Sequence, residues 1–287
     1  MALPTFFIIG AAKAGTTSLH YYLDQHPQIQ MSANKEPNFF SGPENGIPYT
    51  PQRVSRLDHY ERLFDPAIDV RGEASPGYTN HPRRQGVPER IKELIPEARL
   101  LYLVRDPIAR TVSHYQDSFA IGKQRKPLRE ALGDLSDAYL PLTCHSRYAS
   151  QLELYLRHFS QERVMVVDQS DLLADRRSTL QGIFAFLSVD DAFDSSRFDE
   201  QLYTSQGRPI YSFGYWQFVE RLVAPSMRRM PLRLRRSLRR NVERIFLPSL
   251  EAPTLDAELR ARLEDFYADE VDRLRALTGK TFPTWSI

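Results

Sequence analysis

Apolar residues along the 287-residue chain follow two patterns. Short continuous runs rich in β-branched and aromatic residues occur at 5–9, 100–104 and 164–167, and such runs are typical of strands buried on both faces of a sheet. Segments with the spacing of amphipathic helices, such as 18–25 and 148–159, lie between them. Strands that alternate with helices predict an α/β fold with a central parallel sheet flanked by helices.

Further elements follow from weaker patterns. The segment VRGEAS at 70–75 predicts another short strand, and PNFFSGPENGIPYTP at 37–51 predicts an irregular loop in which Phe39 and Phe40 have apolar bulk to bury. An amphipathic helix is expected over 255–277, with Gly279 as a suitable stop. The chain has no repeat and no low-complexity tract, so we expect a single domain over residues 1–287.

The composition places the chain among soluble globular proteins. Hydrophobic residues make up 41% and charged residues 26%, which argues against a disordered or membrane-spanning chain. Cys144 is the only cysteine, so no disulfide can form within the chain. No apolar run approaches the roughly 20 residues of a membrane span, and no basic region precedes FFIIGAA at 6–12, so we expect a cytoplasmic protein.

The net charge of +2 conceals an uneven distribution. Residues 221–244 hold nine arginines and a single acidic residue, Glu243, among apolar residues at helical spacing. Three interpretations stay open: a solvated helical face, a wall that attracts an anionic acceptor, and a surface helix on acidic lipid. No recognisable nucleic-acid-binding motif accompanies the charge, so no nucleic-acid partner is expected.

The stretch TFFIIGAAKAGTTSLHYYLDQHP at 5–27 joins a predicted strand to a predicted helix through a loop of small residues. In a parallel sheet such a turn directs backbone N–H groups and the positive end of the helix toward whatever lies above it, and an anion is the natural ligand. Small side chains keep the loop open, and hydroxyls stand at the start of the helix. These residues are Gly10, Ala11, Ala12, Ala14 and Gly15, followed by Thr16, Thr17 and Ser18.

The position of the lysine separates this loop from that of ATPases. The motif G-x-x-x-x-G-K-[ST] needs lysine directly after its second glycine, whereas here Lys13 comes before Gly15. Asp168, at the end of the run VMVVD, is the only candidate for an aspartate that would hold Mg²⁺. The loop therefore indicates anion binding but not an ordinary ATPase.

The stretch FFIIGAAKAGTTSLHYYLDQHP resembles the 5′-phosphosulfate loop of sulfotransferases that use 3′-phosphoadenosine 5′-phosphosulfate (PAPS), and most of all the heparan-sulfate type. YLVRDPIARTVSHY at 102–115 is similar to that family's 3′-phosphate motif, and the resemblance extends over almost the whole chain as a pattern. It implies a P-loop-like three-layer fold. It also implies functional residues, but only at positions where the motifs match.

For the donor, the resemblance implies that 3′-phosphate contacts come from Arg105 and Ser113, while Arg110 is expected to be solvated or in a salt bridge. SQGRPIYS at 205–212 is similar to the family's late glycine-arginine loop, with Gln206 in place of a basic residue. An ordinary turn is the alternative interpretation of that short match. The implied donor-binding set is Lys13, Ala14, Gly15, Thr16, Thr17, Ser18, Arg105, Ser113, Gly207 and Arg208.

Sulfuryl transfer needs a base that removes the acceptor's proton. RGEASPGY at 71–78 resembles the segment that supplies the family's catalytic glutamate, which implies that Glu73 is the base; a salt bridge to Arg71 is the alternative. NKEPNFF at 34–40 resembles the segment whose lysine, here Lys35, lies near the sulfuryl group. Glu36 is expected only to pair with a cation, and His59 and His81 are the next candidates for the base.

The sequence thus predicts a PAPS-dependent sulfotransferase in which Lys13 and Lys35 neutralise charge on the bridging oxygen and Glu73 takes the acceptor proton. No metal is required in this scheme, because lysines and backbone amides supply the positive charge. The acceptor class stays open among small metabolites, lipids and glycosides, with a hydroxyl or an amine as the reacting group. A small-molecule or nucleotide kinase with an atypical loop and a non-catalytic nucleotide-binding module are the alternatives. The sequence does not indicate an oligomeric state.

Overall fold

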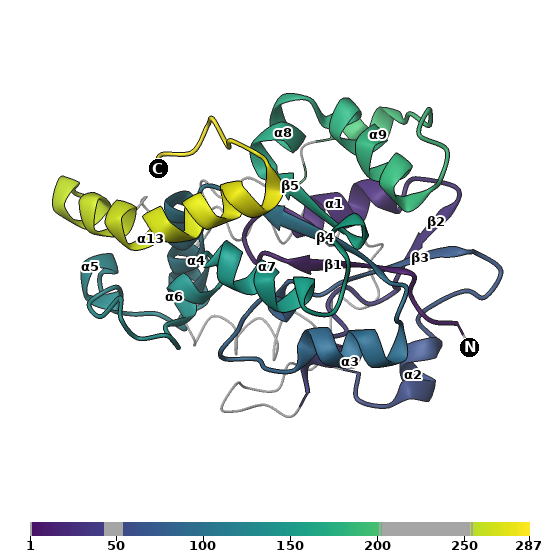
Figure 1. The fold of residues 1–287 in the computed structure, drawn as a ribbon, viewed down its shortest axis with the longest axis horizontal. Helices are drawn as coiled ribbons and strands as arrows, with labels where there is room; N and C mark the ends of the chain where they lie inside the picture. The colour runs from purple at the N-terminus through teal and green to yellow at the C-terminus, as the bar shows by residue number, and fades with distance from the viewer. Residues whose placement is uncertain (1, 43–53, 201, 203–252, 254) are drawn as a thin grey trace, which may run out of the picture.

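The computed structural model describes residues 2–42, 54–200, 202, 253 and 255–287. Within these residues, five strands form one sheet in the order β2-β3-β1-β4-β5 with parallel neighbours throughout (Figure 1). The strands are β1 (Phe6–Gly10), β2 (Ile29–Met31), β3 (Val70–Ala74), β4 (Arg99–Val104) and β5 (Val164–Asp168). All five residues of β1 are buried, as expected for the central strand of a sheet covered on both faces.

The strand order places a topological switch at β1. The chain passes from β1 outward to β2 and back to β3 on one side, and then crosses to β4 and β5 on the other side. In open parallel sheets, ligands bind outside the carboxyl ends of the strands at such a switch. The loop after β1 therefore lies where the fold favours a binding site.

Helices cover both faces of the sheet. On one face lie α1 (Thr16–Leu23) and α9 (Arg176–Leu187), and the ring of His26, three residues after α1, packs against Phe184 of α9 with centroids 4.6 Å apart. On the other face α3 (Val87–Leu94) approaches the end of α7 (Tyr148–Leu156), where the Lys92 ammonium lies 5.3 Å from the centre of the Phe159 ring. This gives the three-layer α/β fold that the sequence predicts.

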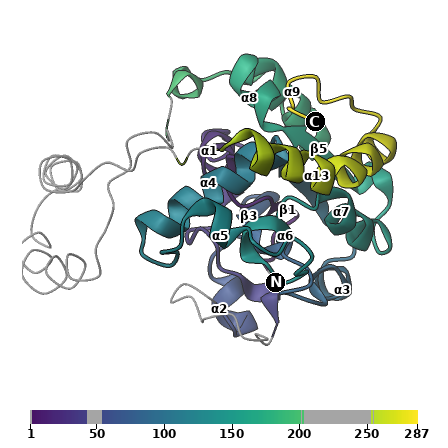
Figure 2. The same ribbon diagram turned by 90° about the vertical axis from the view of Figure 1, so that its left-hand side faces the viewer.

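Two long helices complete the described part of the chain. Helix α4 (Pro107–Ala120) starts directly after β4, with Asp106 accepting a 2.7 Å hydrogen bond from the backbone N–H of Ala109. Helix α13 (Ala257–Thr278), drawn in yellow, lies beside α7 in both views (Figures 1 and 2). It ends at Gly279, which has the left-handed φ of 68°.

The C-terminal residues return to the carboxyl edge of the sheet. The indole N–H of Trp285 donates to the Asp168 carboxylate at 3.1 Å, and the backbone N–H of Ser286 donates to Asp106 at 2.6 Å. Shorter helices and 3₁₀ turns connect the larger elements: η1 (Phe39–Ser41), α2 (Leu57–Glu61), η2 (Pro76–Tyr78), α5 (Leu128–Ala131), α6 (Pro141–Cys144), η3 (Gln161–Arg163), α8 (Gln169–Ala174) and η4 (Ser196–Asp199).

The predicted strands at 5–9, 70–75, 100–104 and 164–167 are confirmed within one or two residues, and the helices at 18–25, 148–159 and 255–277 within three. The three-residue strand β2 was not predicted. Of the predicted loop at 37–51, residues 37–42 are described, and they contain the 3₁₀ turn η1 with Phe40 buried. The single domain over 1–287 stays a prediction, because residues 203–252 lie outside the described part.

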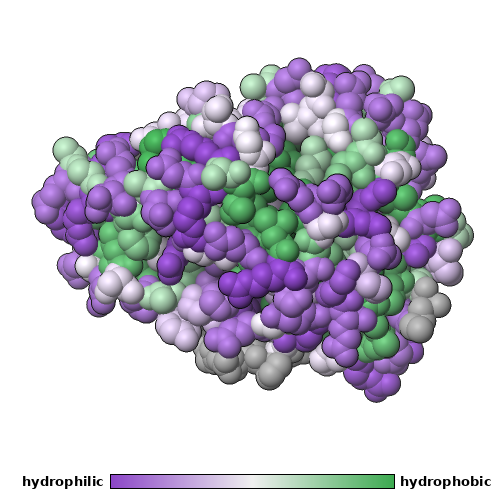
Figure 3. All heavy atoms as spheres, in the orientation of Figure 1, coloured by the Kyte–Doolittle hydropathy of each residue, from purple (hydrophilic) through white to green (hydrophobic). Residues whose placement is uncertain are grey.

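Apolar side chains reach the surface of the described residues at several separate places. On the face shown in Figure 3, apolar areas are small and bordered by hydrophilic ones. The large apolar side chains that are exposed among the described residues come from different segments: Leu57, Ile121, Tyr139 and Leu173. No helix in the described ranges has the length and apolar character to cross a membrane.

Candidate active site

The loop after β1 is compact and opens helix α1. Ala11 donates a 2.6 Å backbone hydrogen bond to Leu103 of β4, which ties the loop to the neighbouring strand. Gly15 caps the helix with φ 99°, a conformation that favours glycine, and a Cβ there would lie 3.2 Å from the Gln169 amide. The first N–H groups of a helix have no partner within it, and no described residue accepts from those of Thr16 and Thr17. This is the geometry of an anion site.

Lys13 lies in the same loop with a φ of 72°. Its ammonium forms an ion pair with Asp117 of α4, with Nζ and Oδ1 2.8 Å apart and the two side chains 21% and 31% exposed. Asp117 is four residues after Ser113, so both side chains lie on the same face of α4. The predicted sulfuryl-contacting lysine is therefore close to the helix that carries the predicted 3′-phosphate contact.

Arg105 follows β4 and reaches across to the loop after β1. One of its guanidinium nitrogens donates to the backbone carbonyl of Lys13 at 3.3 Å. Burial lowers the pKa of Arg105 below its ordinary value, but an arginine stays charged at neutral pH. Ser113, two turns into α4, is 5% exposed. The carboxyl ends of β1 and β4 thus bring Lys13, Arg105 and Ser113 into one region.

The prediction that Arg110 is solvated or in a salt bridge is wrong. Its side chain is fully buried, and within the described residues it forms no ion pair. The guanidinium donates instead to the carbonyl of Ala12 in the loop at 3.3 Å, to the carbonyl of Leu142 and to the hydroxyl of Ser146. Arg110 therefore holds the loop after β1 through a hydrogen bond. The sequence pattern of α4 does not reveal this role.

A neutral histidine pair lies beside this cationic group. Burial, together with the charges of Arg110 and Lys13, lowers the pKa of His114 to about 3. Burial and the charge of Arg110 likewise lower the pKa of His145, whose ring lies 5.7 Å from that of His114. Both imidazoles are therefore uncharged near neutral pH, and the positive potential of the site comes from Lys13, Arg105 and Arg110.

Glu73 lies near the carboxyl end of β3 with no exposed surface. Ser75 donates a 2.6 Å hydrogen bond to its Oε1, and the Tyr60 hydroxyl donates to its Oε2. Burial raises the pKa of Glu73, and hydrogen bonds from Ser75, Tyr60 and Tyr78 act in the opposite direction. The alternative of a salt bridge to Arg71 is not found, since Arg71 donates to the backbone carbonyls of Leu3 and Ile68.

Lys35 and Glu36 lie beside this strand end. The Lys35 ammonium and the Glu36 carboxylate are 2.5 Å apart, as the expected pairing of Glu36 requires, and the Glu36 side chain is 45% exposed. The backbone N–H of Glu36 donates to the carbonyl of Ala74 at 3.0 Å. The charges of both residues also act on His20 of α1, whose pKa is lowered chiefly by burial. The pair of Lys35 and Glu36 therefore lies between the end of β3 and helix α1.

The other predicted residues either lie outside the described part of the chain or have other partners. Gly207, Arg208 and the arginine-rich segment 221–244 lie outside the described residues. Of the alternative bases, His59 is 52% exposed and 3.8 Å from Asp58, while the backbone of His81 pairs with the Gln151 amide. Asp168 caps α8 through the N–H of Ser170 and accepts from Trp285, which gives it a structural role.

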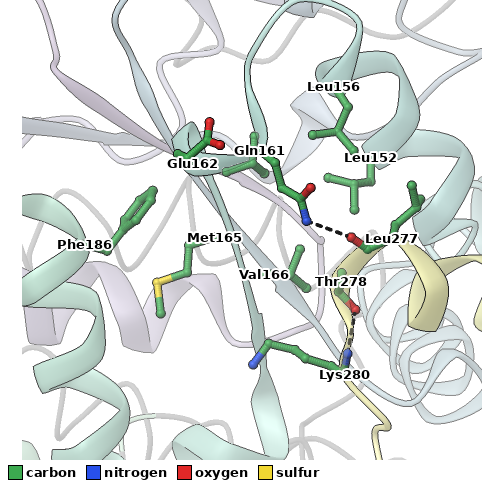
Figure 4. Close-up of a pocket in the computed structure, with 11 residues that line it drawn as sticks. Leu152, Leu156, Gln161, Glu162, Met165, Val166, Phe186, Leu277, Thr278 and Lys280 are labelled. Carbon is green, nitrogen blue, oxygen red and sulfur yellow. Dashed lines mark hydrogen bonds between the residues drawn. The ribbon is translucent and has the colours of Figure 1, made fainter.

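A cavity of about 360 Å³ lies away from this region, against the first residues of the edge strand β5 (Figure 4). Its lining is mainly apolar, with Met165 and Val166 from β5, Phe186 from α9 and Leu277 from α13. None of the predicted site residues lines it. The carboxyl edge of the sheet, and not this cavity, holds the charged groups that suit an anionic donor.

Comparison with known proteins agrees with this geometry. Residues 4–194 match the model of the sulfotransferase family. The chain is 35% identical over 156 residues to the membrane-associated sulfotransferase kil1 of Dictyostelium discoideum, covering 52% of this chain and 31% of kil1. It is 30% identical over 200 residues to human heparan sulfate glucosamine 3-O-sulfotransferase 5, covering 65% of this chain and 54% of the relative. The chain thus spans between about a third and about half of the length of these relatives.

Solved structures show the same fold. A sulfotransferase from Alicyclobacillus acidocaldarius superposes over the whole of both chains with a TM-score of 0.73 and 25% identity. A mouse sulfotransferase, SULT7A1, solved in complex with PAP, covers 96% of this chain and 88% of its own, with a TM-score of 0.55 and 13% identity. The family match over more than half of the chain, on the predicted P-loop-like fold, shows that this chain belongs to the sulfotransferase family.

Proposed function

We propose that this enzyme transfers the sulfuryl group of PAPS to a hydroxyl or an amine of an acceptor. The observation that supports this most is the combination of a glycine-capped helix start with Lys13 and Arg105 at the switch point of the sheet. Such a site suits a ligand with anionic groups at two positions. The mouse relative solved with PAP is consistent with a 3′-phosphorylated adenine nucleotide as the ligand.

On this proposal, the loop and helix start from Lys13 to Ser18 hold the 5′-phosphosulfate, and Arg105, Ser113 and Arg208 hold the 3′-phosphate. Gly207, in the same predicted loop as Arg208, belongs to the proposed donor-binding set. When bound, PAPS supplies the sulfuryl group, and its phosphate takes the electron pair as the bond from sulfur to the bridging oxygen breaks. Lys13 and Lys35 stabilise that negative charge. This assignment needs no metal ion, because the cations and amides of the chain supply the positive charge.

The base is one of two carboxylates. A base must contact the acceptor's O–H or N–H, and Glu73 offers no exposed surface for that contact, whereas Glu36 is 45% exposed beside Lys35. The prediction that Glu73 is the base is untested. We propose instead that Glu36 takes the proton as the new bond to sulfur forms.

The acceptor is proposed only as a class. The relatives named after heparan sulfate suggest a sugar hydroxyl or amine, and these relatives are longer than the present chain. A small metabolite, lipid or glycoside remains within the proposal. The arginine-rich segment 221–244 is proposed as a contact for an anionic acceptor or membrane surface.

Calorimetry tests the donor. We expect tight binding of 3′-phosphoadenosine 5′-phosphate (PAP) with and without Mg²⁺, and weak binding of ADP and ATP, which lack the 3′-phosphate. A preference for ATP with Mg²⁺ would contradict the proposal and favour the kinase alternative.

Turnover tests the chemistry. PAPS is incubated with a phenol, an amino sugar and an alkyl glycoside, and the release of PAP is followed for each. Tight binding of PAP without release of PAP from PAPS in the presence of any acceptor class would favour the non-catalytic nucleotide-binding module. The acceptor that gives the highest rate then serves for Glu36→Gln, which we expect to bind PAP normally and to lose turnover.

A further inference from the structure

Glu73 is a buried carboxylate without a counter-ion. It has no exposed surface, and no lysine, arginine or histidine of the described residues forms an ion pair with it. Burial of an unpaired carboxylate is costly, so a residue that serves stability alone is better apolar at this position. The strand position itself is central, because Glu73 is opposite Phe7 of β1 in the register of the sheet.

Three hydroxyl groups compensate for the missing cation. The hydroxyls of Tyr60 and Ser75 donate to the two carboxylate oxygens, and the Tyr78 side chain forms a third hydrogen bond. Ser75 and Tyr60 are fully buried, and Tyr78 is 2% exposed. The donors come from two parts of the chain, since Tyr60 belongs to α2, whereas Ser75 directly precedes η2 and Tyr78 is its last residue.

Each of these three side chains contacts one residue of a single consecutive segment. The Ser75 oxygen accepts a 3.1 Å hydrogen bond from the backbone N–H of Asn38. The Tyr60 ring stacks on Phe39 with centroids 4.2 Å apart and planes 7° apart. The Tyr78 oxygen accepts a 3.1 Å hydrogen bond from the backbone N–H of Phe40. One carboxylate thereby orients three side chains that hold residues 38–40.

The held segment carries the exposed charged pair. Asn38 donates from its side-chain amide to the carbonyl of Glu36 at 2.7 Å, and Glu36 and Asn38 both have left-handed φ angles, of 62° and 54°. Such angles are strained for residues with a Cβ and persist only where the surroundings enforce them. The contacts that start at Glu73 are therefore suited to keep Lys35 and Glu36 in place.

We propose that Glu73 is a positioning residue, which acts through Tyr60, Ser75 and Tyr78 to fix residues 38–40 and so to orient Glu36 for the acceptor. This inference rests on the proposed sulfuryl transfer with Glu36 as base. It assigns to Glu73 a role that needs no contact with the acceptor.

The pH dependence of turnover distinguishes positioning from base catalysis. In Glu73→Gln we expect kcat to fall by about 100-fold, the loss expected from a displacement of about 1 Å, with the acidic limb of the pH–rate profile retained. In Glu36→Gln the acidic limb should disappear. If Glu73→Gln abolishes that limb while Glu36→Gln keeps it, Glu73 is the base and the inference is wrong.

Hydrogen exchange tests the positioning directly and needs no acceptor. We expect faster amide exchange in the peptide that covers residues 36–41 of Glu73→Gln, and unchanged exchange there in Glu36→Gln. Ser75→Ala keeps the carboxylate but removes the link to Asn38, so it should show the same faster exchange if Glu73→Gln does not fold. Wild-type exchange in Ser75→Ala overturns the inference.

PAP affinity separates this inference from the proposed function. All three variants should bind PAP within about threefold of the wild-type protein, because none of them alters the loop after β1. If the wild-type protein itself fails to bind PAP, the proposed donor is wrong. If it binds PAP and the exchange and pH results are as stated, both proposals stand.

Discussion

Replacing Asp117 with asparagine should tighten the binding of the donor nucleotide. The Asp117 carboxylate is 2.8 Å from the Lys13 ammonium, the group that we propose contacts the 5′-phosphosulfate. An anionic ligand at this loop competes with Asp117 for that ammonium and is also repelled by its negative charge. Asparagine keeps the size of the side chain and removes the charge, so both costs fall in Asp117→Asn.

The magnitude follows from the exposure of the pair. With side chains 21% and 31% exposed, the ion pair is close to the surface class, for which up to about 1 kcal/mol is typical. Repulsion between two unit charges about 4 Å apart in a medium like water adds about 1 kcal/mol. A gain of about 1–2 kcal/mol corresponds to a Kd for PAP that is about 5- to 30-fold lower.

Calorimetric titration with PAP measures this difference. Asp269→Asn is the matched control, because Asp269 forms a 3.0 Å ion pair with Arg273 on α13 and its loss changes the net charge equally. Salt should reduce the advantage of Asp117→Asn by screening. Unchanged affinity in Asp117→Asn, or a gain of equal size in Asp269→Asn, would refute the competition. Weaker binding would mean that Asp117 holds Lys13 in the orientation that the donor needs.

Three further predictions concern the same region. Arg105→Lys should weaken PAP binding by about 10- to 100-fold, the loss of a strong charge-assisted hydrogen bond, and leave adenosine 5′-phosphosulfate, which lacks the 3′-phosphate, unaffected in the same titration. Gly10→Ala should lower the free energy of unfolding by about 1–3 kcal/mol in denaturant titrations, because a Cβ there would lie 1.9 Å from the Thr79 hydroxyl. His114, with a folded pKa of about 3, stays neutral while the unfolded chain binds a proton below pH 6.5, so its contribution to stability falls as pH falls. Between pH 7 and pH 5 this contribution falls by about 2 kcal/mol, and His114→Gln should remove that part of the acid destabilisation. Acid destabilisation of equal size in wild-type protein and His114→Gln would contradict this.

The sequence predicts those strands that are continuous apolar runs. The runs that became β1, β4 and β5 are continuous and apolar, since strands of a parallel sheet that is covered by helices face apolar side chains on both sides. β3 is a weaker signal for two reasons that only tertiary structure explains. A Cβ at Gly72 would lie 2.1 Å from the Phe6 ring, and Glu73 is buried through hydroxyl donors from elsewhere in the chain. β2 is too short to show a period.

The site residues also divide into those that the local sequence reveals and those that depend on tertiary contacts. The residues of the loop after β1 are local in sequence, and their small size, hydroxyls and helix start suffice to indicate an anion site. Arg110 depends on partners 30 or more residues away in the chain, and Glu73 depends on a hydroxyl from α2. No local sequence pattern encodes these contacts. A buried arginine and a buried glutamate therefore look like ordinary surface residues in the sequence. The pairing of Glu36 with a cation is confirmed, but its exposure beside the strand end is likewise a tertiary property that the sequence does not show.

The strand order also implies a separation of the two substrates. The loop after β1 lies between the carboxyl ends of β3 and β4, its immediate neighbours in the sheet. Arg105 and Ser113 lie on the β4 side, so a nucleotide that spans from the loop to these residues occupies that side. Lys35 and Glu36 lie on the β3 side, where the backbone of Glu36 continues the pairing with Ala74. On the proposed donor site, we expect the acceptor to approach over β3, since the transferred group has to face away from its leaving phosphate. Changes on the β4 side should therefore alter PAP affinity, and changes on the β3 side should alter turnover at constant PAP affinity.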